Sequence, residues 1–305
     1  MSDIILHHFD ASPFAEKIRV VLGLKGLSWQ SVQIPMVMPK PDLTALTGGY
    51  RKTPVMQIGA DIYCDTQRIA LELEARFPTP TLFPGNSRAQ ALSIATWADT
   101  QLFQPGAGLS MGTNMDLPED ILADRFAFFD FLDREKLPEQ LPHLFAQFHA
   151  NLHRLEDMLA DGRSWLLGES PSWADAAGYA SVWMCRGNIR GADELLDGMN
   201  RLATWENRMI ELGHGHCAQI TAEQAHAISR SAKSTAEANI DSPTWPDLQL
   251  ATSVTVTPDD YGAVAVTGSL VRLTHDDIAI RRTDEKAGEV VVHFPRIAYR
   301  VEEVK

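Results

Sequence analysis

The sequence contains little cysteine and no long hydrophobic run. Its three cysteines, Cys64, Cys185 and Cys217, lie far apart, at spacings typical of neither a metal site nor a disulfide framework. We therefore expect no metal and a reducing, cytoplasmic environment. The opening residues, MSDIILHHF, lack the basic and then apolar layout of a secretory signal, so export is not expected, and neither is a membrane-spanning helix.

Positive charge is also in short supply. The chain has 27 Lys and Arg against 40 Asp and Glu, which gives a net charge of −13. Nucleic acids and anionic membranes both need clustered basic residues, so neither is an expected partner. With 305 residues, 45% of them hydrophobic, the chain is long enough for a sizeable core and two or three domains.

Hydrophobic periodicity divides the chain into three regions, which we predict as domains 1–84, 87–240 and 245–305. The first alternates strands with helices: strands at 4–9, 29–34, 53–59 and 61–64, and helices at 12–26 and 66–77. This order indicates a small α/β sandwich. The second region is almost wholly helical in period, with Gly and Pro between its segments.

The third region follows the linker NIDSPTWPD (239–247) and alternates apolar and polar residues between turn signals. This pattern predicts four or five antiparallel strands over 248–304, which we expect to curl into a small barrel or half-barrel. Within it, His293 and Arg296 of VHFPR are the residues most suited to chemistry, although a position at the edge of the sheet explains both.

The stretch YRKTPVMQIGADIYCDTQRI (50–69) has two interpretations. Pro54 is either an ordinary edge proline or part of a cis Thr53-Pro54 bond that presents the Thr53 backbone to a peptide-like ligand. Asp65 and Thr66 are either a simple helix cap or a site for a zwitterionic amino-acid group. In the second case Thr66 binds the ligand carboxylate and Asp65 attracts its ammonium.

A second helix start has a similar double interpretation. Ser12 is predicted to cap a helix that has Pro13 at its first position. The cap alone explains the pair. A thiolate held there would meet the Ser12 hydroxyl and the positive end of the helix, which is how a thiol pKa is lowered. A site for a thiolate, a site for a peptide backbone and a site for a zwitterionic amino-acid group together match the chemical groups of glutathione.

Four segments resemble motifs of the cytosolic glutathione transferases, in their serine- and cysteine-type classes. SPFAEKIRVVLGLKGL (12–27) resembles the active-site strand-to-helix motif, KTPV (52–55) the cis-proline turn, and CDT (64–66) the acidic-hydroxyl motif. LLGESPSWADAAGYA (166–180) resembles the helix-capping signature, with Ser172 as the cap and Asp175 three residues later. The resemblance covers about residues 3–215, with all four motifs in order.

The resemblance implies a fold of class α/β plus all-α: a thioredoxin-like N-terminal domain, an all-helical second domain and, here, an extra antiparallel β domain. It implies a homodimer, and glutathione as co-substrate with no metal. Ser12 would be the catalytic residue. Thr53, with Pro54, would clamp the cysteinyl backbone, and Asp65 and Thr66 would hold the γ-glutamyl end. The glycine carboxylate needs a cation, for which Lys52 is preferred over Lys40, with Arg51 a further candidate.

In this family the second substrate, a small hydrophobic electrophile, binds between the domains. The candidates for its pocket are apolar side chains on and after the first helix of the second region, together with one on the first helix: Phe14, Trp97, Leu102, Phe103, Met111 and Met115. Each of the residues from Trp97 onward is alternatively plain core. Serine in place of cysteine at position 12 argues against thiol exchange, because a hydroxyl cannot form a mixed disulfide.

Two hypotheses remain open. The first is an enzyme that activates the glutathione thiolate for conjugation, ether cleavage or isomerisation. The second is a binding or scaffold protein that keeps the fold without turnover and works through its β-rich extension. The retained Ser12, Asp65 and Thr66 favour the enzyme. For the extension itself, the simplest interpretation is a docked stabilising module; a cover over the electrophile pocket, a wider dimer interface or a partner site are the alternatives.

Overall fold

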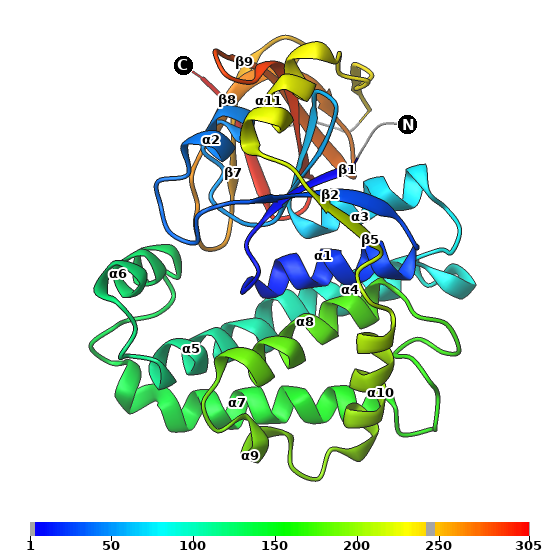
Figure 1. The fold of residues 1–305 in the computed structure, drawn as a ribbon, viewed down its shortest axis with the longest axis vertical. Coiled ribbons are helices and arrows are strands. Elements are labelled where there is room, and N and C mark those ends of the chain that lie inside the picture. Colours follow the sequence, from blue (N-terminus) through cyan, green and yellow to red (C-terminus); the bar gives the residue numbers. More distant parts are fainter. Residues whose placement is uncertain (1–3, 242–247, 305) are drawn as a thin grey trace. The chain divides into compact units, whose positions relative to one another are not determined.

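The computed structural model describes residues 4–241 and 248–304 of the chain (Figure 1). Two compact units emerge from its internal contacts. We call Met1–Asp10, Ser28–Glu72 and Cys217–Lys305 the sheet unit, and Ala11–Leu27 and Leu73–His216 the helical unit. Most of the predicted linker, residues 242–247, lies outside the described residues.

The strands form one sheet in the order β11-β7-β8-β9-β10-β4-β3-β1-β2-β5, with β6 paired to β8. Their bounds are β1 Ile4–His8, β2 Ser28–Gln33, β3 Val55–Ile58, β4 Asp61–Cys64, β5 His216–Gln219, β6 Asn239–Ile240, β7 Ser253–Pro258, β8 Val266–Leu273, β9 Asp277–Asp284, β10 Gly288–Pro295 and β11 Tyr299–Glu303.

The N-terminal part of this sheet is the predicted thioredoxin-like arrangement. β1 pairs in parallel with β2 and antiparallel with β3, and β3 pairs antiparallel with β4. The result is the expected four-stranded mixed sheet. The connection between β2 and β3, for which the sequence predicted neither helix nor strand, contains the additional helix α2 (Pro41–Thr47).

The C-terminal strands β7 to β11 confirm the predicted antiparallel β region, and they continue the N-terminal sheet. β10 pairs in parallel with β4, in a register that places Val292 opposite Ile62. One hydrophobic cluster contains Leu46 of α2, Ile62 of β4 and Phe294 of β10. In Figure 1 the orange and red strands accordingly lie beside the blue ones. The extension therefore shares both hydrogen bonds and core with the N-terminal strands.

The position of β10 corrects one prediction. His293 was interpreted as a residue at a sheet edge, but β10 lies between β4 and β9 and is paired to both. The run Val290–Pro295 is buried throughout. A strand with neighbours on both sides and apolar side chains on both faces is a central strand, so the side chain of His293 is inside the protein.

Helix α11 (Ala222–Ser231) covers part of the same sheet. Ala225 packs in a cluster with Ile5 of β1 and Val32 of β2, and its carbonyl accepts a hydrogen bond of 2.9 Å from the Gln57 side chain. A capping box built from Thr221 and Gln224 starts this helix. The helix agrees with the helical period of this segment, whereas the strand β5 that precedes it was not expected from the sequence.

The helices between Arg88 and Glu211 confirm the predicted helical character of the second region, whereas residues 217–240, also predicted to belong to it, lie in the sheet unit. Of the remaining helices, those with all or most of their residues in the helical unit are α1 Pro13–Leu24, α4 Arg88–Trp97, α5 Phe103–Thr113, α6 Glu119–Phe128, α7 Leu137–Met158, α8 Trp173–Asn188, α9 Ala192–Leu196 and α10 Asn200–Glu211, with short turns at Pro84–Asn86 and Ala98–Leu102. Helix α3 (Thr66–Arg76) has residues in both units. Among the helices of the described residues, none combines the length and the apolar character that crossing a membrane requires.

Candidate functional site

The turn before β3 brings together two of the predicted ligand residues. The Thr53-Pro54 peptide bond is cis, which agrees with the second of the two interpretations of Pro54. The Nζ atom of Lys40 lies 3.4 Å from Oγ1 of Thr53 and 5.3 Å from the centre of the Phe9 ring. Lys40 is almost fully buried. Thr53 in this turn is partly exposed. The buried ammonium group of Lys40, which precedes α2, lies next to the Thr53 hydroxyl.

Asp65 stands at the start of α3 in the left-handed region, with φ of 76°. Its Oδ1 atom accepts a 2.9 Å hydrogen bond from the backbone N–H of Gln67, as a helix cap does. Its Oδ2 atom accepts a 3.0 Å hydrogen bond from the hydroxyl of Tyr299 in β11. Thr66 begins the helix and is nearly buried. The cap interpretation of Asp65 is therefore present in the structure, together with a contact from the C-terminal strands.

Lys52, which the family resemblance suggested as the cation for a glycine carboxylate, has an acidic partner in the structure. Its Nζ atom forms a short ion pair with Asp260, in the loop between β7 and β8, and lies 4.7 Å from the ring centre of Tyr261. Burial raises the pKa of Asp260, and Lys52 opposes this effect. The same loop also approaches Gly49, three residues before Lys52. A Cβ atom added to Gly49 would lie 3.9 Å from a methyl group of Val264.

Ser12 occupies the predicted cap position of α1, in the helical unit. Its Oγ atom accepts a 3.1 Å hydrogen bond from the N–H of Ala15, and Pro13 follows at the first helical position. Ser12 is only 4% exposed. A hydroxyl donates and accepts at the same time, so capping leaves the Ser12 proton available to a ligand.

The first turns of α1 are surrounded by aromatic and charged side chains of the helical unit. The ring of Phe14 packs edge-on against Phe103, with centroids 4.7 Å apart. Lys17 is fully buried and donates to both carboxylate oxygens of Asp99 at 2.7 Å. Asp99 lies in the π-helical turn Ala98–Leu102, a local widening of the helix that often occurs at functional sites.

The other predicted pocket residues differ in exposure. Leu102, Phe103 and Met111 are each at most 5% exposed, which matches their alternative role as core. Met115, in contrast, is 36% exposed. The side chain of Trp97 is held by a 3.0 Å hydrogen bond from its indole N–H to the side-chain oxygen of Asn151.

The predicted cap of α8 is present. The carboxylate of Asp175 accepts hydrogen bonds from both the backbone and the hydroxyl of Ser172, and further ones from the Leu166 N–H and the Trp205 indole. It is fully buried, and burial raises its pKa in spite of these donors. Ser172 and Asp175 thus form the capping box at the N-terminus of α8.

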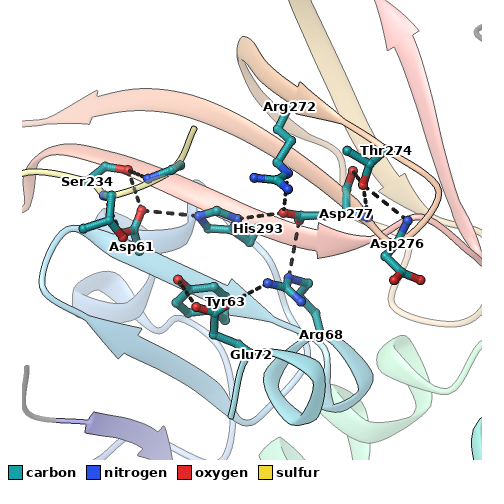
Figure 2. Close-up of polar contacts among 12 residues, drawn as sticks. Asp61, Tyr63, Arg68, Glu72, Ser234, Arg272, Thr274, Asp276, Asp277 and His293 are labelled. Carbon is teal, nitrogen blue, oxygen red and sulfur yellow. Dashed lines mark hydrogen bonds and ion pairs between the residues drawn. The ribbon is translucent and has the colours of Figure 1, made fainter. Parts of the chain in front are cut away.

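The sheet unit contains a second group of polar side chains, of which the sequence singled out only His293 (Figure 2). We call it the charge cluster, and it consists of Asp61, Arg68, Glu72, Arg272, Asp277 and His293. The imidazole of His293 lies between Asp61 and Asp277, at 3.3 and 3.4 Å. Arg68 and Arg272 approach Asp277 at 3.4 and 3.5 Å, and Arg68 pairs with Glu72.

The protonation of His293 follows from this arrangement. Three carboxylates face two arginines, so the cluster is neutral only when His293 carries a proton. Burial lowers the pKa of His293, but the hydrogen bonds to Asp277 and Asp61 outweigh it and raise the pKa. Conversely, burial of Asp61 is outweighed by His293, Ser234 and Thr235, which lower its pKa to about 2. The cluster binds β10 to β4 and has the composition of a structural ion-pair network.

Comparison with known proteins identifies the family. Residues 6–81 match the model of the glutathione S-transferase N-terminal domain, and residues 138–208 match that of the C-terminal domain. A glutathione S-transferase (GST)-like protein from Pseudomonas syringae is 35% identical, with a TM-score of 0.81, and the match covers 100% of both chains. The chain belongs to the glutathione S-transferase family. A search of the curated proteins found no match.

Other solved structures match only part of the chain. A glutathione S-transferase from Rhodospirillum rubrum is 20% identical, with a TM-score of 0.52, and the match covers 67% of this chain and 86% of that one. The β-etherase LigF from Sphingobium is 16% identical, with a TM-score of 0.54, and the match covers 70% and 98%. At this identity they show the shared fold. About a third of this chain has no counterpart in them, whereas the P. syringae protein matches along its whole length.

Proposed function

We propose that this glutathione S-transferase family member is a glutathione-dependent enzyme that activates the glutathione thiolate for attack on a small hydrophobic electrophile. The observation that carries the proposal is Ser12, a nearly buried hydroxyl at the N-terminus of α1 whose oxygen already accepts the cap bond. Its proton is then available for a hydrogen bond to a ligand, and both the hydroxyl and the helix end would favour a thiolate over a thiol.

The tripeptide would be held by the residues that match the family motifs. Thr53, before the cis proline, would pair with the cysteinyl backbone of glutathione. Thr66 and the first N–H groups of α3 would bind the γ-glutamyl carboxylate, and Asp65 its ammonium. Lys40 or Lys52 would face the glycine carboxylate. Rate would come from thiolate activation and from the proximity of the two substrates.

The electrophile would meet apolar side chains of the helical unit. Phe14, packed on Phe103, and the 36%-exposed Met115 are the candidates with the most accessible surface. Conjugation, ether cleavage and isomerisation would all use the same thiolate. A β-etherase among the structures with this fold makes ether cleavage a reaction worth including in a substrate screen.

Ser12→Ala tests the proposal at one atom. Loss of a hydrogen bond to a charged group costs about 1.5–3 kcal/mol, so the pKa of the bound thiol should rise by roughly one to two units. Turnover at neutral pH should fall about tenfold to a hundredfold, with little change in glutathione affinity. The measurement is a pH titration of thiolate absorbance in the glutathione complex. Identical titration curves for wild type and Ser12→Ala would remove Ser12 from the mechanism.

Two further experiments address the remaining proposals. A scaffold without turnover, working through β7 to β11, would be retained on immobilised glutathione yet catalyse none of the three reactions. A two-fold homodimer is the association we propose from the family, and light scattering at micromolar concentration measures it. Since β10 occupies the edge of β4, an edge-to-edge pairing of two β4 strands is not the contact we propose.

A further inference from the structure

The C-terminal strands reach the residues that the proposed function assigns to the γ-glutamyl end of glutathione. Tyr299 of β11 donates its hydroxyl proton to Oδ2 of Asp65 at 3.0 Å. The hydroxyl of Tyr50, in the turn before β3, lies 2.9 Å from that of Tyr299. Both tyrosines are 3% exposed and pack around Phe294. A row of hydrogen bonds through two buried tyrosine hydroxyls therefore ends on the carboxylate of Asp65, which is partly buried.

The direction of the hydrogen bonds in this row is fixed by chemistry. An ionised carboxylate only accepts hydrogen bonds, so the proton of Tyr299 goes to Asp65. The oxygen of Tyr299 must then accept the proton of Tyr50. Burial, with the nearby charge of Asp65, raises the pKa of both tyrosines, which keeps both protons in place at neutral pH. The row holds one carboxylate oxygen of Asp65 while the helix cap holds the other.

We propose that Tyr299 is a positioning residue for ligand binding: it fixes the Asp65 carboxylate in the orientation that receives the γ-glutamyl ammonium, with Tyr50 in support. This inference rests on the proposed function. It assigns the C-terminal strands a part in ligand recognition through one hydroxyl. A carboxylate held by two donors loses less rotamer freedom when the ammonium binds, which favours binding.

The test compares glutathione with its deaminated analogue, in which a glutaryl group replaces the γ-glutamyl group. Calorimetry gives the dissociation constant of each for wild type, Tyr299→Phe and Tyr50→Phe. Wild type should prefer glutathione, and Tyr299→Phe should reduce that preference roughly threefold to tenfold, the effect of one hydrogen bond. Tyr50→Phe leaves the bond to Asp65 intact and should change the preference less. Asp65→Asn should remove most of it.

The outcomes distinguish failure of the proposed role of Tyr299 from failure of the proposed glutathione-dependent function. A purely structural role for Tyr299 would lower stability and weaken both ligands equally, and an unchanged preference in Tyr299→Phe overturns the inference. Equal binding of both ligands by wild type overturns it as well, while leaving glutathione binding intact. Binding of neither ligand by folded wild type overturns the proposed function and the inference with it.

A different observation carries a second proposal at the glycyl end. The carboxylate of Asp260 pairs with Lys52. In the proposed function, Lys52 is one of two lysines, with Lys40, that would bind the glycine carboxylate of glutathione. The ion pair is partly exposed to solvent: the side chain of Lys52 is 13% exposed and that of Asp260 is 38% exposed. We infer that Asp260 is a specificity-determining residue that disfavours a free carboxylate at this end of the ligand, because two like charges would share one cation.

The test uses glutathione and its glycine amide, which has the same shape without the terminal charge. Asp260→Asn should tighten binding of glutathione about threefold to tenfold and leave the amide nearly unchanged. Asp259→Asn is the matched control, because its side chain pairs with Arg300 instead. Equal effects of Asp260→Asn on both ligands, or none on either, overturn this proposal. They do not affect the proposed function, which binding of glutathione by wild type tests separately.

Discussion

The C-terminal strands contact the N-terminal ones in two ways. At β10 they meet β4 through the charge cluster, in which His293 is 4% exposed and lies between two carboxylates. At the turn before β3 they meet Lys52 through Asp260, whose side chain is 38% exposed. The chemical groups are similar, but the surroundings differ. A buried pair is costly to break, whereas a pair in contact with water exchanges readily for solvent or ligand.

The largest effect is expected inside the charge cluster. Asp277→Ala leaves His293, Arg68 and Arg272 without their shared carboxylate, and removing one partner of a buried ion pair typically costs about 3–5 kcal/mol. Urea unfolding should show this loss. Asp276→Ala is the control, since its side chain is 41% exposed, and it should cost about 1 kcal/mol or less. Similar losses in the two variants would mean that burial does not distinguish these carboxylates.

The pH dependence of stability should carry the signature of His293. Its folded pKa is raised above 6.5, so its contribution is complete below pH 6.5 and is lost as the pH rises through the folded value. Asp61 acts in the opposite direction: its contribution is present above pH 3.8 and is lost as the pH falls toward about 2. Denaturant unfolding from pH 5 to 9 should therefore show a decline in wild type that is weaker in His293→Gln. Parallel profiles would assign the decline to other groups.

The smallest effect on stability is expected at the turn before β3, where Asp260 pairs with Lys52. Asp260→Asn should change the free energy of unfolding by about 1 kcal/mol or less, the range of partly exposed ion pairs. Thermal unfolding of the variant without ligand measures this change. A loss as large as that of Asp277→Ala would make Asp260 a structural residue and remove the contrast between the two regions.

Much of the fold could be predicted from sequence because its signals are local. The cap at Ser12, the proline at position 54 and the capping box at Ser172 each determine the conformation of a few neighbouring residues. The alternation of the C-terminal region likewise predicted its strands. Helix α2 was missed because its seven residues lie in a segment rich in proline and glycine.

What could not be predicted are pairings between distant segments. The parallel register of β10 with β4 joins residues more than 200 positions apart, and no local pattern specifies it. One signal was available: the run Val290–Val292 is continuously apolar, as in strands that are covered on both faces. The contacts of Tyr299 with Asp65 and of Asp260 with Lys52 depend on that pairing, so they appear only in the structure.

We propose that the C-terminal strands belong to the part of the protein that binds glutathione. Hydrogen exchange of the full chain, measured by mass spectrometry with and without saturating glutathione, tests it directly. Glutathione should slow exchange in peptides that contain Thr53 and Asp65, and equally in those that contain Asp260 and Tyr299, because these residues are in contact. Slower exchange near Thr53 and Asp65, with no change in residues 258–264 and 299–303, would contradict the claim.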